Sequence, residues 1–151
     1  MKKYIYIILM PFLFLSCDYK PIYSNKNNYN FVIEKIDFDG DREINNLINK
    51  KLKKYQNKES EKKFSIFALS SYEKIAQSKD LSGKTTNYLV TIDVSFEIKK
   101  ENKVEKISFK EEFLIKNFSN KFEENNLEKI KKENLIDLVI SRLVIQLSQI
   151  E

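Results

Sequence analysis

Apolar and polar side chains alternate most regularly in the stretch TNYLVTIDVSFEIKK, residues 86–100. Every second residue from Tyr88 to Ile98 is apolar. From Thr91 to Lys99, the residues that alternate with them are polar. A period of two is typical of a strand that buries one face and wets the other. The stretch therefore predicts a strand in a sheet that has one face open to water.

Three other stretches have the composition of strands. They are FVIEKIDFDG at 31–40, KKFSIFALSSYEKIAQ at 62–77 and VEKISFKEEFLIKNF at 104–118. The turn sequences SGKT and KENK separate the last three strands, at residues 82–85 and 100–103. Runs joined by such short polar turns predict an antiparallel meander, with the first strand ending at Gly40.

Two helices are predicted by apolar spacings of three and four. The first follows Asp41, a suitable N-cap residue, and its apolar face comprises Ile44, Leu47, Ile48, Leu52 and Tyr55. The second covers residues 125–151, and Asn125 and Glu128 have the spacing of a capping box. The lysines of the first helix indicate a solvated outer face.

The second helix carries two apolar stripes. One comprises Leu135, Val139, Leu143 and Leu147, and the other Ile136, Ile140 and Val144. A helix on a sheet needs only one stripe, so the second stripe predicts another partner on its far side. The alternative is that a surface loop or the N-terminal segment covers it.

The order of elements is strand, helix, three strands, helix. It predicts an α+β fold, a two-layer sandwich with a four-stranded, mostly antiparallel sheet and both helices on one face. We place this domain at residues 31–151, since 151 residues suit one domain better than two.

Residues 1–16 have the parts of an export signal. Lys2 and Lys3 precede an apolar run that ends at Leu15, and Ser16 is the small residue before the break. The run is too short to span a bilayer, which takes about 20 residues. The only cysteine, Cys17, follows at once, as in the lipobox of bacterial lipoproteins. We expect a lipidated N-terminus and tether at 17–30; the alternative is an ordinary cleaved signal with an incidental thiol.

Composition limits the chemistry of the mature domain. The chain contains no histidine and a single cysteine, which removes the commonest general base and a thiolate metal site. No glycine-rich phosphate loop or nucleophile motif occurs. We therefore expect no enzyme, no metal and no cofactor. The net charge of +5 falls to +3 once Lys2 and Lys3 leave, so we expect no nucleic-acid binding.

The start of the mature chain resembles a known family. CDYKPIY, residues 17–23, is similar to the lipidated start of LptE, the lipopolysaccharide-assembly lipoprotein, where Cys-Gly-Phe/Tyr-Arg-Pro-Leu-Tyr is usual. The order of strands and helices fits that family too. The resemblance implies a non-enzymatic outer-membrane lipoprotein, anchored at the periplasmic face. It would assemble and plug the β-barrel LptD and contact lipopolysaccharide.

Asp18 departs from the family pattern, because it stands where glycine is common. An acidic residue after the lipidated cysteine holds some lipoproteins at the inner membrane, so that location stays open as the alternative.

Lipopolysaccharide carries phosphates beside acyl chains, so its contacts need cations next to apolar surface. The candidate residues are lysines at the two strand turns, namely Lys79, Lys84, Lys99 and Lys100. Turn lysines also protect sheet edges without binding anything. Two other functions stay open at this point: a free-standing periplasm-facing lipoprotein that binds a soluble or lipid ligand, and an exported enzyme.

Overall fold

The computed structural model describes residues 30–56 and 59–150. The predicted signal, Cys17 and all but the last residue of the predicted tether lie outside these residues. The elements in chain order are β1 (Phe31–Gly40), α2 (Arg42–Leu52), the 3-10 turn η2 (Lys53–Tyr55), β2 (Lys62–Lys79), β3 (Thr85–Lys100), β4 (Lys103–Lys116) and α3 (Lys121–Gln149).

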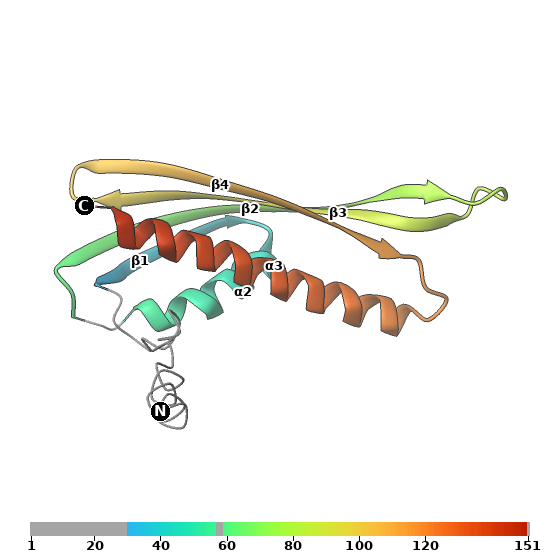
Figure 1. Cartoon of the computed structure of the whole chain (residues 1–151), viewed down its shortest axis with the longest axis horizontal. Coiled ribbons are helices and arrows are strands. Elements are labelled where there is room, and N and C mark those ends of the chain that lie inside the picture. The colour runs from blue at the N-terminus through green and yellow to red at the C-terminus, as the bar shows by residue number, and fades with distance from the viewer. Residues whose placement is uncertain (1–29, 57–58, 151) are drawn as a thin grey trace, which may run out of the picture.

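The four strands form one mixed sheet in the order β1-β2-β3-β4. β1 runs parallel to β2, and β2, β3 and β4 pair antiparallel as the predicted meander. Both helices lie on the same side of this sheet (Figure 1). The predicted two-layer α+β sandwich is therefore confirmed. Its one parallel pair, β1 and β2, is joined by a crossover through α2.

The core lies between the sheet and the two helices. β3 follows its sequence pattern, since Val90, Ile92, Val94, Phe96 and Ile98 are all buried. The intervening side chains of β3 lie on the opposite face of the sheet, which no described element covers. The period of two in this strand thus separates the core from an open face.

The connection from β1 to α2 depends on a glycine. Gly40 has a φ of +92°, and a Cβ there would lie 1.9 Å from the Ser70 carbonyl oxygen. The Asp41 amide donates to that same carbonyl at 3.0 Å. Asp41 Oδ1 then accepts from the Ile44 amide at 2.8 Å, which confirms Asp41 as the N-cap of α2.

α3 begins earlier than the sequence predicted. The N-cap is Asn120, whose side chain accepts from the Phe122 amide at 3.0 Å and donates to Glu123 at 3.1 Å. The predicted capping box of Asn125 and Glu128 was wrong, because both residues already lie inside the helix, whose capping residues are Asn120 and Glu123.

The two apolar stripes of α3 both have partners in the chain. Val139, Leu143 and Leu147 are buried, and so are Ile136, Ile140 and Val144. α2 packs beside α3, where Lys51 Nζ donates to Asp137 at 2.7 Å. The second stripe is therefore covered by α2 together with the sheet. Within the described residues, no helix is both long and apolar enough to span a membrane.

Candidate functional site: a charged pocket and a distant hairpin tip

The four lysines predicted to contact lipopolysaccharide lie at opposite ends of the sheet. Lys79 ends β2 and Lys84 lies in the turn before β3, whereas Lys99 and Lys100 end β3. Lys99 is 14 positions after Thr85 in β3, which corresponds to about 45 Å of extended chain. The structure therefore forms two pairs of lysines and does not bring all four together.

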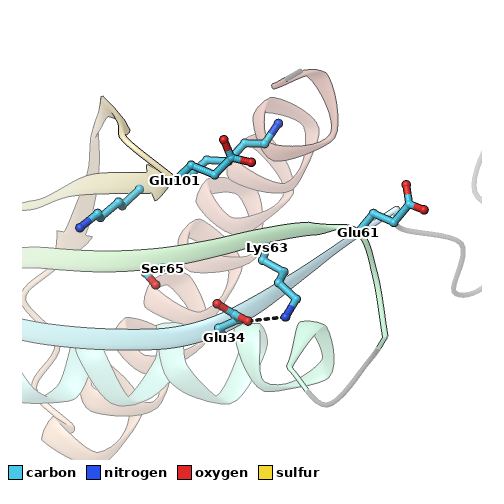
Figure 2. Close-up of a pocket in the computed structure, with 7 residues that line it drawn as sticks. Glu34, Glu61, Lys63, Ser65 and Glu101 are labelled. Carbon is cyan, nitrogen blue, oxygen red and sulfur yellow. Dashed lines mark ion pairs between the residues drawn. The ribbon is translucent and has the colours of Figure 1, made fainter.

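Lys99 and Lys100 line a pocket of about 350 Å³ on the open face of the sheet, near the turn between β3 and β4. Figure 2 shows this charged pocket, with Glu34 of β1, Lys63 and Ser65 of β2, and Glu101 of the turn around it. Glu61, just before β2, completes the lining. The parallel pairing of β1 and β2 sets Val32 opposite Lys63, and Glu34 lies at a register shift of β1, close enough to Lys63 for an ion pair.

The charges in this pocket are unevenly paired. Lys63 Nζ lies 2.9 Å from Glu34 Oε1, in an ion pair that is exposed to water on both sides. Among the residues that the structure describes, neither Lys99 nor Lys100 has an ion-pair partner. The ammonium groups of Lys99 and Lys100 can bind an anionic group, and the carboxylates of Glu61 and Glu101 can bind a cationic one. The pocket is thus suited to a small anionic or zwitterionic group.

The hairpin between β2 and β3 carries the other lysine pair, Lys79 and Lys84, at a turn that hydrogen bonds to Asp80 stabilise. Asp80 Oδ1 accepts hydrogen bonds from the Ser82 hydroxyl at 2.6 Å, the Ser82 amide at 2.9 Å and the Lys84 amide at 3.0 Å. The Ser82 hydroxyl bond, followed by the Lys84 amide, lowers the pKa of Asp80. Leu81 projects fully exposed from the apex. The tip therefore holds an apolar side chain between Lys79 and Lys84.

A third group of charges lies between the layers, and three of its members are buried, namely Glu124, Glu128 and Lys132. We call it the ionic cluster; its members are Glu43 of α2, Tyr72 and Lys74 of β2, and Glu124, Glu128 and Lys132 of α3. Glu128 lies at its centre. It accepts from the Tyr72 hydroxyl at 2.5 Å and from Lys74 Nζ at 2.7 Å, and lies 3.0 Å from Lys132 Nζ.

Hydrogen bonds decide the protonation states inside the ionic cluster. Burial works to raise the pKa of Glu128, but the bonds from Lys74, Tyr72 and Lys132 outweigh it and hold that pKa at about 2. Burial likewise works to lower the pKa of Lys132, and its bonds to Glu43 and Glu128 raise it instead. For Tyr72, burial and the bond to Glu128 act together and raise the pKa of the phenol. All these groups keep their ordinary charges at neutral pH.

Lys132 also lies over an aromatic ring. Its Nζ is 4.0 Å from the centre of the Tyr72 ring, while Lys74 Nζ is 4.7 Å from the centre of the Tyr88 ring. A cation over a ring face is attracted to it, so the two rings replace part of the water that the ammonium groups lose. The ionic cluster is thus saturated by its own members, and its arrangement is that of a structural clamp.

Sequence reasoning missed both the pocket partners and the ionic cluster. Glu34 and Lys63 carry no spacing that links them. For the cluster a signal existed: Glu124, Glu128 and Lys132 continue the buried line of Ile136 and Ile140 at steps of four. Charged residues on the line of a buried stripe indicate buried pairing. Across residues 30–56 and 59–150, no three acidic, histidine or cysteine side chains converge as they would around a metal ion.

Comparison with known proteins finds likeness at the level of the fold. No protein-family model matches the chain, and no curated protein sequence matches it. Rare lipoprotein B from Shewanella oneidensis superposes with a TM-score of 0.55 at 12% identity, over 75% of this chain and 96% of that one. The chain has the fold of that lipoprotein.

Two other solved lipoproteins align less well. Lipoprotein B from Nitrosomonas europaea has a TM-score of 0.48 at 14% identity, over 79% of this chain and 88% of that one. A minor lipoprotein from Acinetobacter baumannii has a TM-score of 0.43 at 17% identity, over 77% of this chain and 93% of that one. The likeness to the Shewanella structure, at 12% identity, is a likeness of fold and agrees with the predicted α+β sandwich.

Proposed function

We propose that this chain is a non-enzymatic lipoprotein of the outer membrane, anchored through Cys17, that pairs with an LptD-like β-barrel. In this function it helps the barrel to assemble, plugs it and contacts lipopolysaccharide. One observation supports the proposal: CDYKPIY directly follows a stretch with the pattern of an export signal, in a chain that has the fold of a solved lipoprotein. The saturated ionic cluster supports a structural function, because its titratable groups are committed to one another.

Purification from membranes in mild detergent tests this proposal. We expect a roughly one-to-one complex with a large β-barrel, and a mature N-terminus at Cys17 with its lipids attached, read by mass spectrometry. A Cys17→Ala variant should lose membrane attachment while the domain still folds. A chain that begins elsewhere, or carries a free thiol at Cys17, would refute the anchor; a monomer without a barrel would refute the partnership.

Lipopolysaccharide contact is tested separately at each end of the sheet, because the structure separates the lysine pairs. One variant combines Lys79→Glu with Lys84→Glu, and the other combines Lys99→Glu with Lys100→Glu. We expect at least one of them to weaken lipopolysaccharide binding by roughly tenfold or more, since each reverses two exposed cations. Lys50→Glu with Lys53→Glu on α2 and η2 is the matched control. Unchanged binding in both test variants would remove these lysines from the contact.

The charged pocket favours a second candidate function. A free-standing lipoprotein could use Lys99 and Lys100 to hold the anionic group of a soluble or lipid ligand. In that case detergent extraction should yield the protein without a barrel and with a small molecule bound. The Lys99→Glu, Lys100→Glu variant should then lose that molecule, whereas the hairpin-tip variant should retain it.

A further inference from the structure

β4 is an edge strand with an unpaired outer side. It spans residues 103–116 and pairs with β3 only. The Leu114 carbonyl accepts from Lys131 Nζ at 2.9 Å, and no other described residue bonds to the outer edge of the strand. An unpaired edge of this length can hydrogen-bond a further strand unless its side chains oppose that pairing.

The side chains on the open face of β4 decide which strand it could accept. In order they are Val104, Lys106, Ser108, Lys110, Glu112 and Leu114. Val104 is 56% exposed and Leu114 is 53% exposed. The row thus has an apolar residue at each end, with charges of both signs between them.

This row is complementary to itself in one antiparallel register. If two copies of β4 pair with Phe109 opposite Phe109, Lys106 faces Glu112 of the other copy and Val104 faces its Leu114. A shift of two residues in either direction sets lysine against lysine, either Lys106 against Lys110 or Lys110 against itself. Like charges directly opposite in a sheet oppose pairing, and opposite charges favour it.

Ion pairs within the chain already extend toward this interface. Lys106 Nζ lies 2.5 Å from Glu97 on β3, and Lys110 Nζ lies 3.2 Å from Glu112. In the Phe109-centred register, Glu97, Lys106, Glu112 of the other copy and its Lys110 form a row of alternating charge. No lysine or glutamate on this row then faces its own sign.

We propose that β4 pairs antiparallel with β4 of a second copy of this chain, around a two-fold axis at Phe109, to give a continuous eight-stranded sheet. A two-fold interface uses the same patch on both copies, which self-complementarity requires. The proposal does not depend on the barrel partner or on lipopolysaccharide.

The helix layer adds apolar surface to the same edge. Arg142 of α3 pairs with Glu111 of β4, so this flank of the helix lies by the edge strand. Leu138 and Ile145, four residues before and three after Arg142, share that flank and are 40% and 55% exposed. In the paired sheet, the flanks of the two α3 helices approach each other across the axis.

Charge reversal with restoration tests the register. The full mature protein in detergent is studied by sedimentation equilibrium for its oligomeric mass. We expect a dimer, weakened roughly tenfold or more by Lys106→Glu and by Glu112→Lys, because each places like charges opposite. The double variant should restore the dimer to within about threefold of the original affinity. Lys129→Glu, on the exposed surface of α3, is the control and should leave the dimer unchanged.

The double variant separates association from folding. It places a carboxylate beside Glu97 and an ammonium beside Lys110, so it repairs no contact within the chain. Restored association can therefore come only from the pair between copies. A monomer at high micromolar concentration, a dimer that ignores both single reversals, or a double variant that stays monomeric would each overturn the proposal. Circular dichroism of every variant verifies that the fold is retained.

Discussion

The two ends of the sandwich fill their interiors with different chemistry. In the proximal half, α2 and the C-terminal part of α3 lie together under the sheet, and the interior consists of apolar side chains such as Phe64, Phe96 and Leu143. In the distal half, the N-terminal part of α3 lies alone under the longer strands, and the ionic cluster occupies the space between the layers.

The difference follows from how many helices cover the sheet. α2 has 11 residues and reaches the ionic cluster only with Glu43 in its first turn. A single helix cannot seal a wide sheet from water, so long side chains with charged ends suit this half. Their stems cover apolar surface while their heads pair with one another. The distal half is therefore stabilised by ion pairs and hydrogen bonds, which depend on geometry. The proximal half is stabilised by the burial of apolar surface.

The largest effect is expected for a cavity in the proximal half. Phe96→Ala should lower the free energy of unfolding by about 3–5 kcal/mol, because Phe96 is fully buried and packs edge-on against Phe109. Urea unfolding followed by circular dichroism measures it. Phe122→Ala, at an exposed position of α3 away from the proposed dimer flank, is the matched control and should cost about 0.5 kcal/mol or less. A loss below about 1 kcal/mol for Phe96→Ala would contradict an apolar core there.

A smaller but still large effect is expected for the centre of the ionic cluster. Glu128→Gln should cost about 2–4 kcal/mol, because it leaves the buried ammonium group of Lys132 and the half-buried one of Lys74 without their shared carboxylate. The same urea titration measures this loss. Glu133→Gln, one turn further along α3, should change stability by less than about 0.5 kcal/mol. Equal effects of the two substitutions would show that the cluster contributes nothing specific.

Acid should weaken the distal half through the same carboxylate. The pKa of Glu128 is about 2 in the folded chain and 4.5 ordinarily, so its contribution is complete above pH 4.5 and is lost as the pH falls toward 2. The shift corresponds to about 3 kcal/mol, and exposure of Lys74 reduces this to on the order of 2 kcal/mol.

Urea midpoints at pH 7, 5 and 3 measure this dependence. Glu128→Gln should remove the part of the acid sensitivity that Glu128 supplies, whereas Phe96→Ala should retain it. An acid dependence that is identical in the original chain and in Glu128→Gln would assign the sensitivity to other carboxylates.

The proximal half was more predictable from the sequence than the distal half, for a physical reason. Apolar burial produces a periodic pattern in the sequence, and the alternation in β3 and the cap at Asp41 both led to correct elements. Ion pairing by itself produces no such pattern. Glu128 and Lys132 are of the same residue types as solvated helix residues. Only their spacing of four residues from the buried Ile136 distinguishes them.

The contact of the turn lysines with lipopolysaccharide stays a prediction. Of the four lysines, Lys99 and Lys100 line the charged pocket. Its other walls could not be predicted, because they depend on the register of the parallel β1–β2 pair, which brings Glu34 to Lys63 across a crossover. Strand register is set by packing in three dimensions, and no local spacing records it.

The smallest effects are expected at the two hairpin turns, one at each end of the sheet. The distal turn places Gly83 at a φ of +81°, while the proximal turn places Glu101 at a φ of +52°. A residue with a side chain is strained in this left-handed region by roughly 1 kcal/mol, and glycine is not. Gly83→Ala should therefore cost about 1 kcal/mol. Glu101→Gly should gain about 0.5 kcal/mol or less, since the greater freedom of unfolded glycine offsets most of the relief.

Thermal unfolding of the two turn variants measures these small changes. Ser82→Ala at the distal turn is a further comparison, because it removes the hydroxyl that braces Asp80 but leaves Gly83 in place. A loss for Gly83→Ala that exceeds the loss for Ser82→Ala would locate the requirement in the backbone conformation. The reverse order would show that the hydrogen bond between the Ser82 hydroxyl and Asp80 matters more for stability than the backbone conformation. The distal tip would then depend on polar pairing, as the ionic cluster does.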